Sequence, residues 1–254
     1  MGEIIADRAN FGGSREIIVL PSMCDSSSQI SVPAIFDIFQ DTASLHADTF
    51  DMGPAGMERR SMFWILTKTR VHIIRRPVML DRVTVKTWIQ PSERVSCERD
   101  FAIYSGDELL IYGRSMWASV SRETGKLVRM GEFYPDVDNP QPVPDDRPFV
   151  RMGKHNDGAV EIGSYTIRST DIDLGRHMNN VSYVRAMLGC YSSQQLEEMD
   201  INEVEVNYIS QSFEGGTLRF LSRPSADDDP DLIREIAAVN DEDKTVFTAR
   251  LLHR

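Results

Sequence analysis

The same order of sequence patterns occurs twice in this chain, and this repeat limits the folds that it can adopt. In each half, a short strand-like run leads through a polar loop into a helical stretch, which is followed by four strand-like runs. Asp25 corresponds to Asp173 in this scheme, and Val71 corresponds to Val206. A helix followed by an antiparallel meander predicts an α+β fold with a sheet wrapped around the helix. Its repetition predicts two fused domains of this kind.

Apolar residues at helical spacing predict helices over 32–47 and 181–199. The strands predicted in the first half are 17–20, 69–76, 82–90, 96–105 and 108–120, and those in the second are 164–168, 204–212, 217–223, 232–239 and 245–252. The first half has 13 extra residues between its helix and its sheet, in the stretch around MGPAGMERRSMF.

A proline-rich segment separates the two halves. Five prolines between residues 131 and 150 exclude regular helix and central strand and favour an extended connector: Pro135, Pro140, Pro142, Pro144 and Pro148. We therefore predict an N-terminal domain over 1–134, a linker over 135–150 and a C-terminal domain over 151–254.

Charge is divided unevenly along the chain. The net charge of −11 falls entirely on residues 131–254, while residues 1–130 sum to zero. Residues 59–86 nevertheless carry eight basic side chains and one acid, Asp81. Such a stretch is either a set of solvated surface positions or a binding surface for an anionic partner. Nucleic acid is not an expected partner, because the whole molecule would repel it.

No apolar run approaches the roughly 20 residues of a membrane-spanning helix. The N-terminal segment has no basic region followed by an apolar core, so we do not expect it to be a secretory signal. The three cysteines form no CxxC pair and no metal-like cluster with the five histidines. We expect a cytoplasmic protein with no membrane contact, no metal and no cofactor.

The densest polar cluster lies between a strand and a helix, at residues 171–180. An Asn at a helix start normally caps free backbone N–H groups, and Asn179 or Asn180 is expected to do so. The remaining N–H groups at a helix start can polarise a carbonyl. Beside them, Asp173 can activate water or attack directly, and His177 can orient the reacting oxygen.

These residues carry a family resemblance. The segment STDIDLGRHMNNVSYV resembles the signature of acyl-acyl-carrier-protein (acyl-ACP) thioesterases, in which Asp-x-Asn-x-His-x-Asn-Asn opens the helix of the second hotdog domain. The run WILTKTRVHIIRRPVMLDRVTVKTW resembles the same family in the first half. The resemblance implies two tandem hotdog domains forming a pseudo-dimer, and release of fatty acids from acyl carrier protein (ACP).

By this resemblance, Asp173 and His177 match the family's catalytic residues, and Asn179 and Asn180 match the Asn pair that follows. Three positions differ. Gly175 stands where the family has Asn, and Gln211 and Ser212 stand where it has Glu and Cys. A Gln can hydrogen-bond a water but cannot take its proton, so Asp173 is expected to be the base or nucleophile.

We expect the thioester carbonyl to face the backbone N–H groups near Met178, Asn179 and Asn180, with Gln211 positioning water or substrate. Because Gln29 stands where the second half has His177, one active site per chain is expected. We expect Phe36 and Phe39 to be core residues rather than residues that line an acyl channel.

The resemblance implies ACP as the partner, and Arg59, Arg60, Arg75 and Arg76 are the candidate docking residues. Three alternatives remain: an acyl-coenzyme A (acyl-CoA) thioesterase, which shares the fold and the Gly-His feature, a catalytically weak acyl-binding hotdog protein and, with least support, a hotdog dehydratase. A homodimer of the whole chain is possible.

Overall fold

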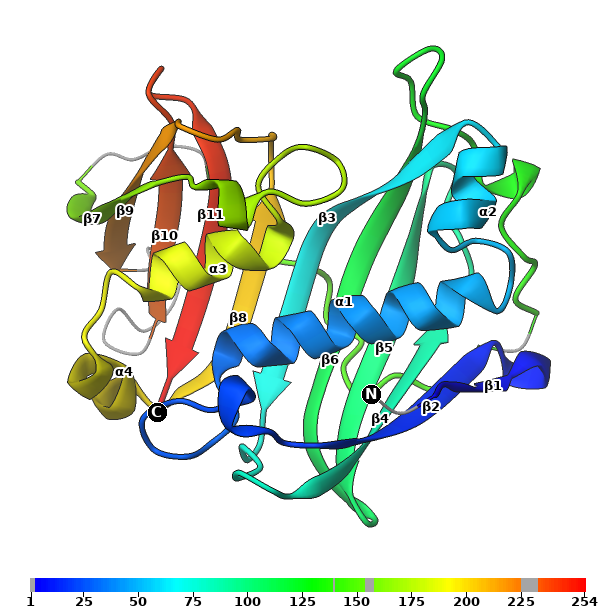
Figure 1. Cartoon of the computed structure of the whole chain (residues 1–254), viewed down its shortest axis with the longest axis horizontal. Helices are drawn as coiled ribbons and strands as arrows, with labels where there is room; N and C mark the ends of the chain where they lie inside the picture. The colour runs from blue at the N-terminus through cyan, green and yellow to red at the C-terminus, as the bar shows by residue number, and fades with distance from the viewer. Residues whose placement is uncertain (1–2, 139, 154–157, 225–232) are drawn as a thin grey trace. The chain divides into compact units, whose positions relative to one another are not determined.

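A computed structural model describes residues 3–138, 140–153, 158–224 and 233–254, which divide into two compact units, Met1–Arg147 and Pro148–Arg254. Figure 1 shows that each unit consists of an antiparallel sheet with a helix lying across one face. The division falls inside the segment in which we placed the linker.

The first unit contains a six-stranded sheet in the order β1-β2-β4-β5-β6-β3, with antiparallel pairing throughout. Its elements are β1 (Ile5–Asp7), β2 (Gly12–Ile18), α1 (Val32–Asp48), α2 (Pro54–Arg59), β3 (Met62–Ile73), β4 (Arg82–Ile89), β5 (Ser96–Ser105) and β6 (Glu108–Ser121).

Helix α1 forms because its sequence supplies both a cap and an apolar face. The Ser31 hydroxyl accepts the Ala34 N–H (3.3 Å), which satisfies a free donor at the helix start. Phe36 and Phe39 are buried, and the Phe39 ring stacks on Phe101 of β5 at 4.4 Å. These two phenylalanines are therefore core residues. In the described part of the chain, no helix combines the length and apolar character needed to cross a membrane.

The second unit contains a five-stranded antiparallel sheet in the order β8-β11-β10-β9-β7. Its elements are β7 (Val160–Thr166), α3 (Asn180–Leu188), α4 (Ser193–Met199), β8 (Ile201–Tyr208), β9 (Thr217–Pro224), β10 (Ile233–Val239) and β11 (Thr245–His253). The predicted strand residue Leu232 lies outside the described residues.

The prediction of one helix over 181–199 is wrong, because the chain forms two helices, α3 and α4. Gly189 follows the last residue of α3, and glycine is a poor helix former. Ser192 then starts α4 with a capping box, in which its hydroxyl accepts the Gln195 N–H and its own N–H donates to the Gln195 side chain.

The insertion in the first unit forms the short helix α2, which begins at Pro54. Trp64 of β3 donates from its indole nitrogen to the Met52 carbonyl (2.9 Å) and so ties the insertion to the sheet. Strand β3 begins at Met62, seven residues before the predicted start.

Strand β8 ends at Tyr208, whereas the sequence pattern predicted a strand up to Ser212. The N–H groups of Ile209 and Ser210 both donate to the Val246 carbonyl, at 2.9 and 3.1 Å. This shared acceptor interrupts the regular ladder. Gln211 and Ser212 consequently lie in the loop between β8 and β9 rather than on a strand.

Each unit holds its own part of the connector through a side chain of one strand. In the first unit, Arg70 of β3 donates to the Asp145 carboxylate (3.2 Å) and to the Arg147 carbonyl (2.9 Å). In the second unit, Glu205 of β8 accepts the Val150 N–H (2.5 Å). Residue 139 of the predicted linker lies outside the described residues.

Candidate active site

The polar cluster forms a tight loop between β7 and α3. Ile172 and Met178 form an isolated antiparallel bridge across the loop. The Asp173 N–H donates to the His177 carbonyl, and the Arg176 N–H donates to the Asp173 carbonyl, each at 3.0 Å. Arg176 adopts a left-handed conformation with φ of 62°. The loop therefore brings Asp173 and His177 to the same end of a closed turn.

The Asp173 carboxylate lies beside the His177 imidazole. Oδ1 of Asp173 is 3.6 Å from Nδ1 of His177, and the two side chains are 26% and 24% exposed. The same oxygen accepts the Gly175 N–H at 2.7 Å. Backbone hydrogen bonds of the loop thus hold the two side chains next to each other. Both side chains remain accessible to water and substrate, as an acid–base pair requires.

Gly175 makes this close arrangement possible. A Cβ atom at position 175 would lie 2.5 Å from Nε2 of His177 and 3.0 Å from Oδ1 of Asp173. No other residue type fits without displacing one of the two groups. The departure from the family's Asn at this position therefore has a steric reason in this chain.

Asp171 and Asn179 have structural roles around the loop. The Asp171 carboxylate accepts the Tyr165 hydroxyl and the Arg168 N–H, both at 2.8 Å. Asn179 is the N-cap of α3, and its side chain accepts the Val181 N–H at 2.8 Å. Of the two asparagines considered as caps, Asn179 is the one that caps the helix.

The helix start offers fewer free N–H groups than the sequence suggested. The Met178 N–H donates to the Ser212 carbonyl and the Asn179 N–H donates to the Asp171 carbonyl, both at 2.8 Å. These two groups are therefore not available to a thioester carbonyl. Asn180 is the first residue of α3, and no acceptor for its N–H is found among the described residues.

The loop after β8 lies against this turn through the Met178–Ser212 hydrogen bond. The Gln211 side chain is exposed, whereas Ser212 is buried. The hydroxyl of Tyr183, on α3, makes a long hydrogen bond to the Ser210 carbonyl (3.4 Å). Burial raises the pKa of Tyr183, and the charge of Asp173 adds to this effect. Tyr183 was not predicted as a site residue, although it lies in the segment VSYV that carries the resemblance.

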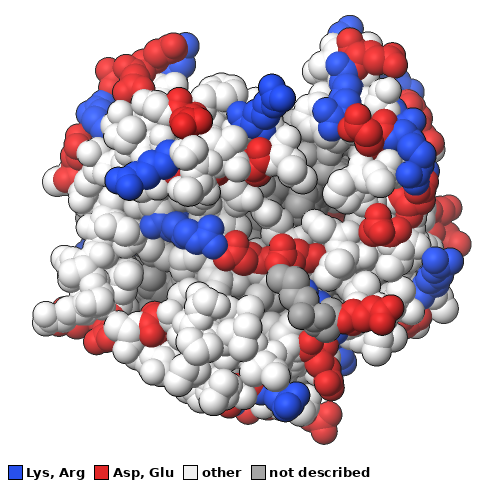
Figure 2. All heavy atoms as spheres, viewed as in Figure 1, with Lys and Arg blue, Asp and Glu red and all other residues white. Residues whose placement is uncertain are grey.

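All four predicted docking arginines form ion pairs within the first unit. Arg59 and Arg60 both bind Asp51, the latter at 2.9 Å, Arg75 binds Glu108 at 2.7 Å and Arg76 binds Asp25. On the face seen in Figure 2, basic side chains likewise lie next to acidic ones. The positive charge of residues 59–86 is therefore partly neutralised locally.

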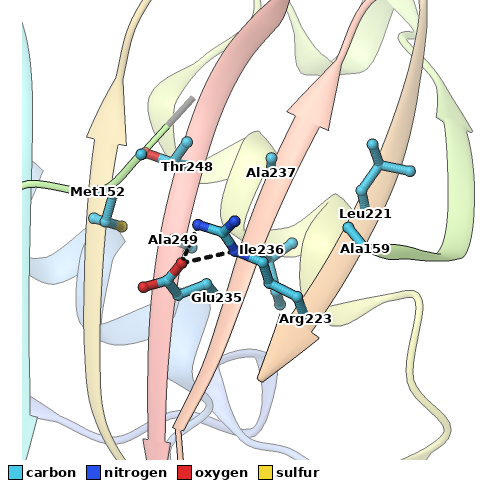
Figure 3. Close-up of a pocket in the computed structure, with 10 residues that line it drawn as sticks. Met152, Ala159, Leu221, Arg223, Glu235, Ile236, Ala237, Thr248 and Ala249 are labelled. Carbon is cyan, nitrogen blue, oxygen red and sulfur yellow. Dashed lines mark hydrogen bonds and ion pairs between the residues drawn. The ribbon is translucent and has the colours of Figure 1, made fainter. Parts of the chain in front are cut away.

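A small pocket in the second unit lies away from this loop. Figure 3 shows most of its residues on β9, β10 and β11, Ala237 and Ala249 among them, with an ion pair between Arg223 and Glu235 (2.6 Å). Met152 and Ala159 line the pocket from outside these strands. None of its lining residues belongs to the 171–180 loop or to the loop after β8.

Family comparisons agree in both halves. The model of the acyl-ACP thioesterase N-terminal domain matches residues 14–136, and that of the acyl-ACP thioesterase C-terminal domain matches residues 154–250. An acyl-[acyl-carrier-protein] hydrolase of Cuphea viscosissima is 27% identical over 193 residues, which is 70% of this chain and 46% of the relative. A palmitoyl-acyl carrier protein thioesterase of Cuphea hookeriana is 27% identical over 194 residues, with the same coverage. The chain thus spans less than half the length of these curated relatives.

Two solved structures share the fold over nearly the whole chain. An acyl-ACP thioesterase from Bacteroides thetaiotaomicron has a TM-score of 0.86 at 19% identity, covering 98% of this chain and 100% of its own. The 12:0-ACP thioesterase from Umbellularia californica has a TM-score of 0.81 at 22% identity, covering 96% and 97%. These matches confirm the predicted hotdog-type α+β fold.

Proposed function

This chain belongs to the acyl-ACP thioesterase family, and we propose that it hydrolyses the thioester of fatty acyl chains carried on ACP. The observation that carries the proposal is the Asp173–His177 pair, 3.6 Å apart at the start of α3 in the C-terminal domain. A thioesterase needs a base beside a donor that can stabilise a developing oxyanion, and this loop offers both.

The reaction follows from the geometry of the loop. The thioester carbonyl oxygen accepts the Asn180 N–H, where the positive end of the α3 dipole stabilises negative charge. Asp173 removes a proton from water, and the water oxygen bonds to the carbonyl carbon. The C–S bond then breaks, and the leaving thiolate receives the proton, which gives a free fatty acid and the carrier thiol. We assign the orientation of Asp173 and substrate to His177, and the positioning of water to Gln211.

Direct attack by the Asp173 carboxylate on the carbonyl carbon is the alternative chemical route. It forms an anhydride that water then cleaves, and cleavage at the Asp173 carbonyl carbon places oxygen from labelled water in the Asp173 carboxylate in a single turnover. The water route labels only the fatty acid. Label in the peptide that contains Asp173, detected by mass spectrometry, therefore identifies the anhydride route.

The nature of the carrier is the second part of the proposal. We propose ACP rather than coenzyme A, because both family models and the curated relatives named above are of the ACP type. The exposed arginines Arg59 and Arg75 are the stronger docking candidates, since their side chains are 63% and 48% exposed, against 35% for Arg60 and 17% for Arg76.

The experiment compares hydrolysis of matched acyl-ACP and acyl-CoA substrates by the purified protein. Preferential turnover of acyl-ACP supports the proposal, and preferential turnover of acyl-CoA supports the coenzyme A alternative. Binding of acyl chains without turnover of either substrate would indicate an acyl-binding protein. A cytoplasmic location and a homodimer stay predictions, and the curated plant relatives are named as chloroplastic.

A further inference from the structure

The loop before α1 in the first unit has the same backbone hydrogen bonds as the active-site loop before α3. The Asp25 N–H donates to the Gln29 carbonyl at 2.8 Å, as the Asp173 N–H donates to the His177 carbonyl at 3.0 Å. In both loops the residue three positions after the aspartate has a positive φ, 59° in the first and 62° in the second. The backbone of the loop is therefore a shared scaffold.

The equivalence extends to the segment after the next long strand. The Ile30 N–H donates to the Pro77 carbonyl at 2.9 Å, and the Met178 N–H donates to the Ser212 carbonyl at 2.8 Å. The two acceptors are separated by the same offset that relates Val71 to Val206. Because the scaffold is common to both units, the side chains that differ between the two loops are the candidates for groups specific to chemistry.

Two of these differences involve His177 and Gln211, which already have roles in the proposed reaction. Gln29 takes the place of His177, and Arg76 takes the place of Gln211. In the first unit Arg76 forms an ion pair with the carboxylate of Asp25. A side chain at this position therefore points towards the loop aspartate in the first unit, and Gln211 occupies the corresponding position in the second.

A third difference is Tyr183, whose counterpart in the first unit is Ile35. Both residues are buried on the helix that follows the loop. The Tyr183 hydroxyl donates to the Ser210 carbonyl, whereas an isoleucine can make no such bond. Because its burial disfavours the phenolate form, Tyr183 remains a neutral hydrogen-bond donor.

We propose that Tyr183 is a positioning residue of the thioesterase site. Its hydroxyl holds the segment 210–212 against α3, and this segment carries both Gln211 and the carbonyl that accepts the Met178 N–H. Tyr183 thereby fixes Gln211 relative to Asp173 without touching substrate. This inference rests on the proposed function, since it names a support of the same site.

The test is Tyr183→Phe, with Tyr208→Phe as a matched control. The Tyr208 ring lies 6.1 Å from that of Tyr183, and among the described residues its buried hydroxyl has no hydrogen-bond partner. Both variants lose one hydroxyl from the same aromatic cluster. Tyr183→Phe should lower kcat for acyl-ACP about tenfold with KM within about twofold, as expected when a positioned group is displaced. Tyr208→Phe should leave both constants near those of the wild type.

Hydrogen exchange of the Met178 amide gives a readout that does not depend on activity. Tyr183→Phe should speed this exchange at least tenfold relative to Tyr208→Phe, because the acceptor segment loses its anchor. Equal kcat values in the two variants, or equal Met178 exchange rates, would overturn the inference. If the wild type hydrolyses no thioester, the proposed function fails, and the exchange comparison still decides the role of Tyr183.

Discussion

At the scale of single residues, Asp173 has a structural role in addition to the chemical role that we propose for it. Its carboxylate accepts the Gly175 N–H, and Asp25 in the first unit accepts the Ser27 N–H in the same way, at 3.0 Å. Since the first unit has no histidine at the corresponding position, this hydrogen bond belongs to the scaffold. Replacement by Ala would remove both roles at once, whereas Asn keeps an acceptor for the Gly175 N–H and removes only the base.

Gly175→Ala tests the steric account of this turn. The added methyl would lie 2.5 Å from Nε2 of His177, so the imidazole must move away from Asp173. Steady-state kinetics on acyl-ACP should show kcat lowered by at least about tenfold, because small displacements of reacting groups are costly. The control is Gly131→Ala, where a Cβ has nothing within 4 Å and activity should be unchanged. Equal activities of the two variants would contradict the account.

At the scale of elements, the start of α3 combines an observed helix cap with a proposed catalytic role. Asn179 caps α3 through the Val181 N–H, and Ser31 caps α1 through the Ala34 N–H. Two similar caps therefore lie in two similar loops, of which only one is proposed to be catalytic.

We expect Asn179→Ala and Ser31→Ala to lower the free energy of unfolding by about 1 kcal/mol each, as loss of a helix cap usually does. Only Asn179→Ala should also lower kcat, because it disturbs the helix start that holds the Asn180 N–H, the group proposed to bind the thioester carbonyl. Urea unfolding and steady-state kinetics measure the two effects. A similar loss of kcat in Ser31→Ala would show that the active site responds to stability alone.

Helix α1 carries a buried histidine that makes stability depend on pH. His46 accepts a hydrogen bond from Arg99 at 2.8 Å, because a guanidinium can only donate. Burial, together with the charge of Arg99, lowers the pKa of His46 to about 3. The unfolded chain takes up a proton near pH 6.5 that the folded chain does not bind, so stability falls as the pH drops from about 6.5 towards 3.

Within that window, His46 lowers the free energy of unfolding by up to about 1.4 kcal/mol per pH unit. Replacing His46 with Gln should reduce this pH-dependent loss of stability. The measurement is the free energy of urea unfolding between pH 7 and pH 4, with His253→Gln as the control at the end of β11. An unchanged slope in His46→Gln would exclude this histidine as the source.

The sequence was most informative about elements whose local pattern matches their final environment. The apolar spacing of residues 32–47 predicted α1, and α1 extends from Val32 to Asp48. The end of β8 was not predictable, because it depends on a carbonyl at Val246, about 40 residues away. The division between α3 and α4 could have been inferred from Gly189 and from the capping pair Ser192 and Gln195, so this error was one of interpretation.

At the scale of the whole molecule, the repeat and the two-unit organisation were predictable because they depend on pattern alone. The local environment of the charged side chains was not predictable. The acids that pair with the candidate docking arginines, Asp51, Glu108 and Asp25, come next to them only through folding. For the same reason, the occupied N–H groups of Met178 and Asn179 were visible only in the structure.

The proposed docking arginines predict a selective effect of charge reversal. The double variant Arg59→Glu/Arg75→Glu should raise KM for acyl-ACP about tenfold at low salt and leave acyl-CoA hydrolysis within about twofold, because exposed charges act mainly on association. The control is Arg219→Glu in the second unit, whose side chain is 42% exposed and also ion-paired. Equal changes for both substrates would argue against carrier-specific docking at these residues.

The central claim is that the Asp173 carboxylate performs the chemistry of thioester hydrolysis. The most direct measurement is kcat/KM for acyl-ACP in the wild type and in Asp173→Asn, with the unfolding midpoint of each protein measured alongside. We predict a loss of at least about a thousandfold in kcat/KM with little change in the midpoint, as expected when an essential base is removed from an intact site. Turnover within tenfold of the wild type in a folded Asp173→Asn protein would contradict the claim.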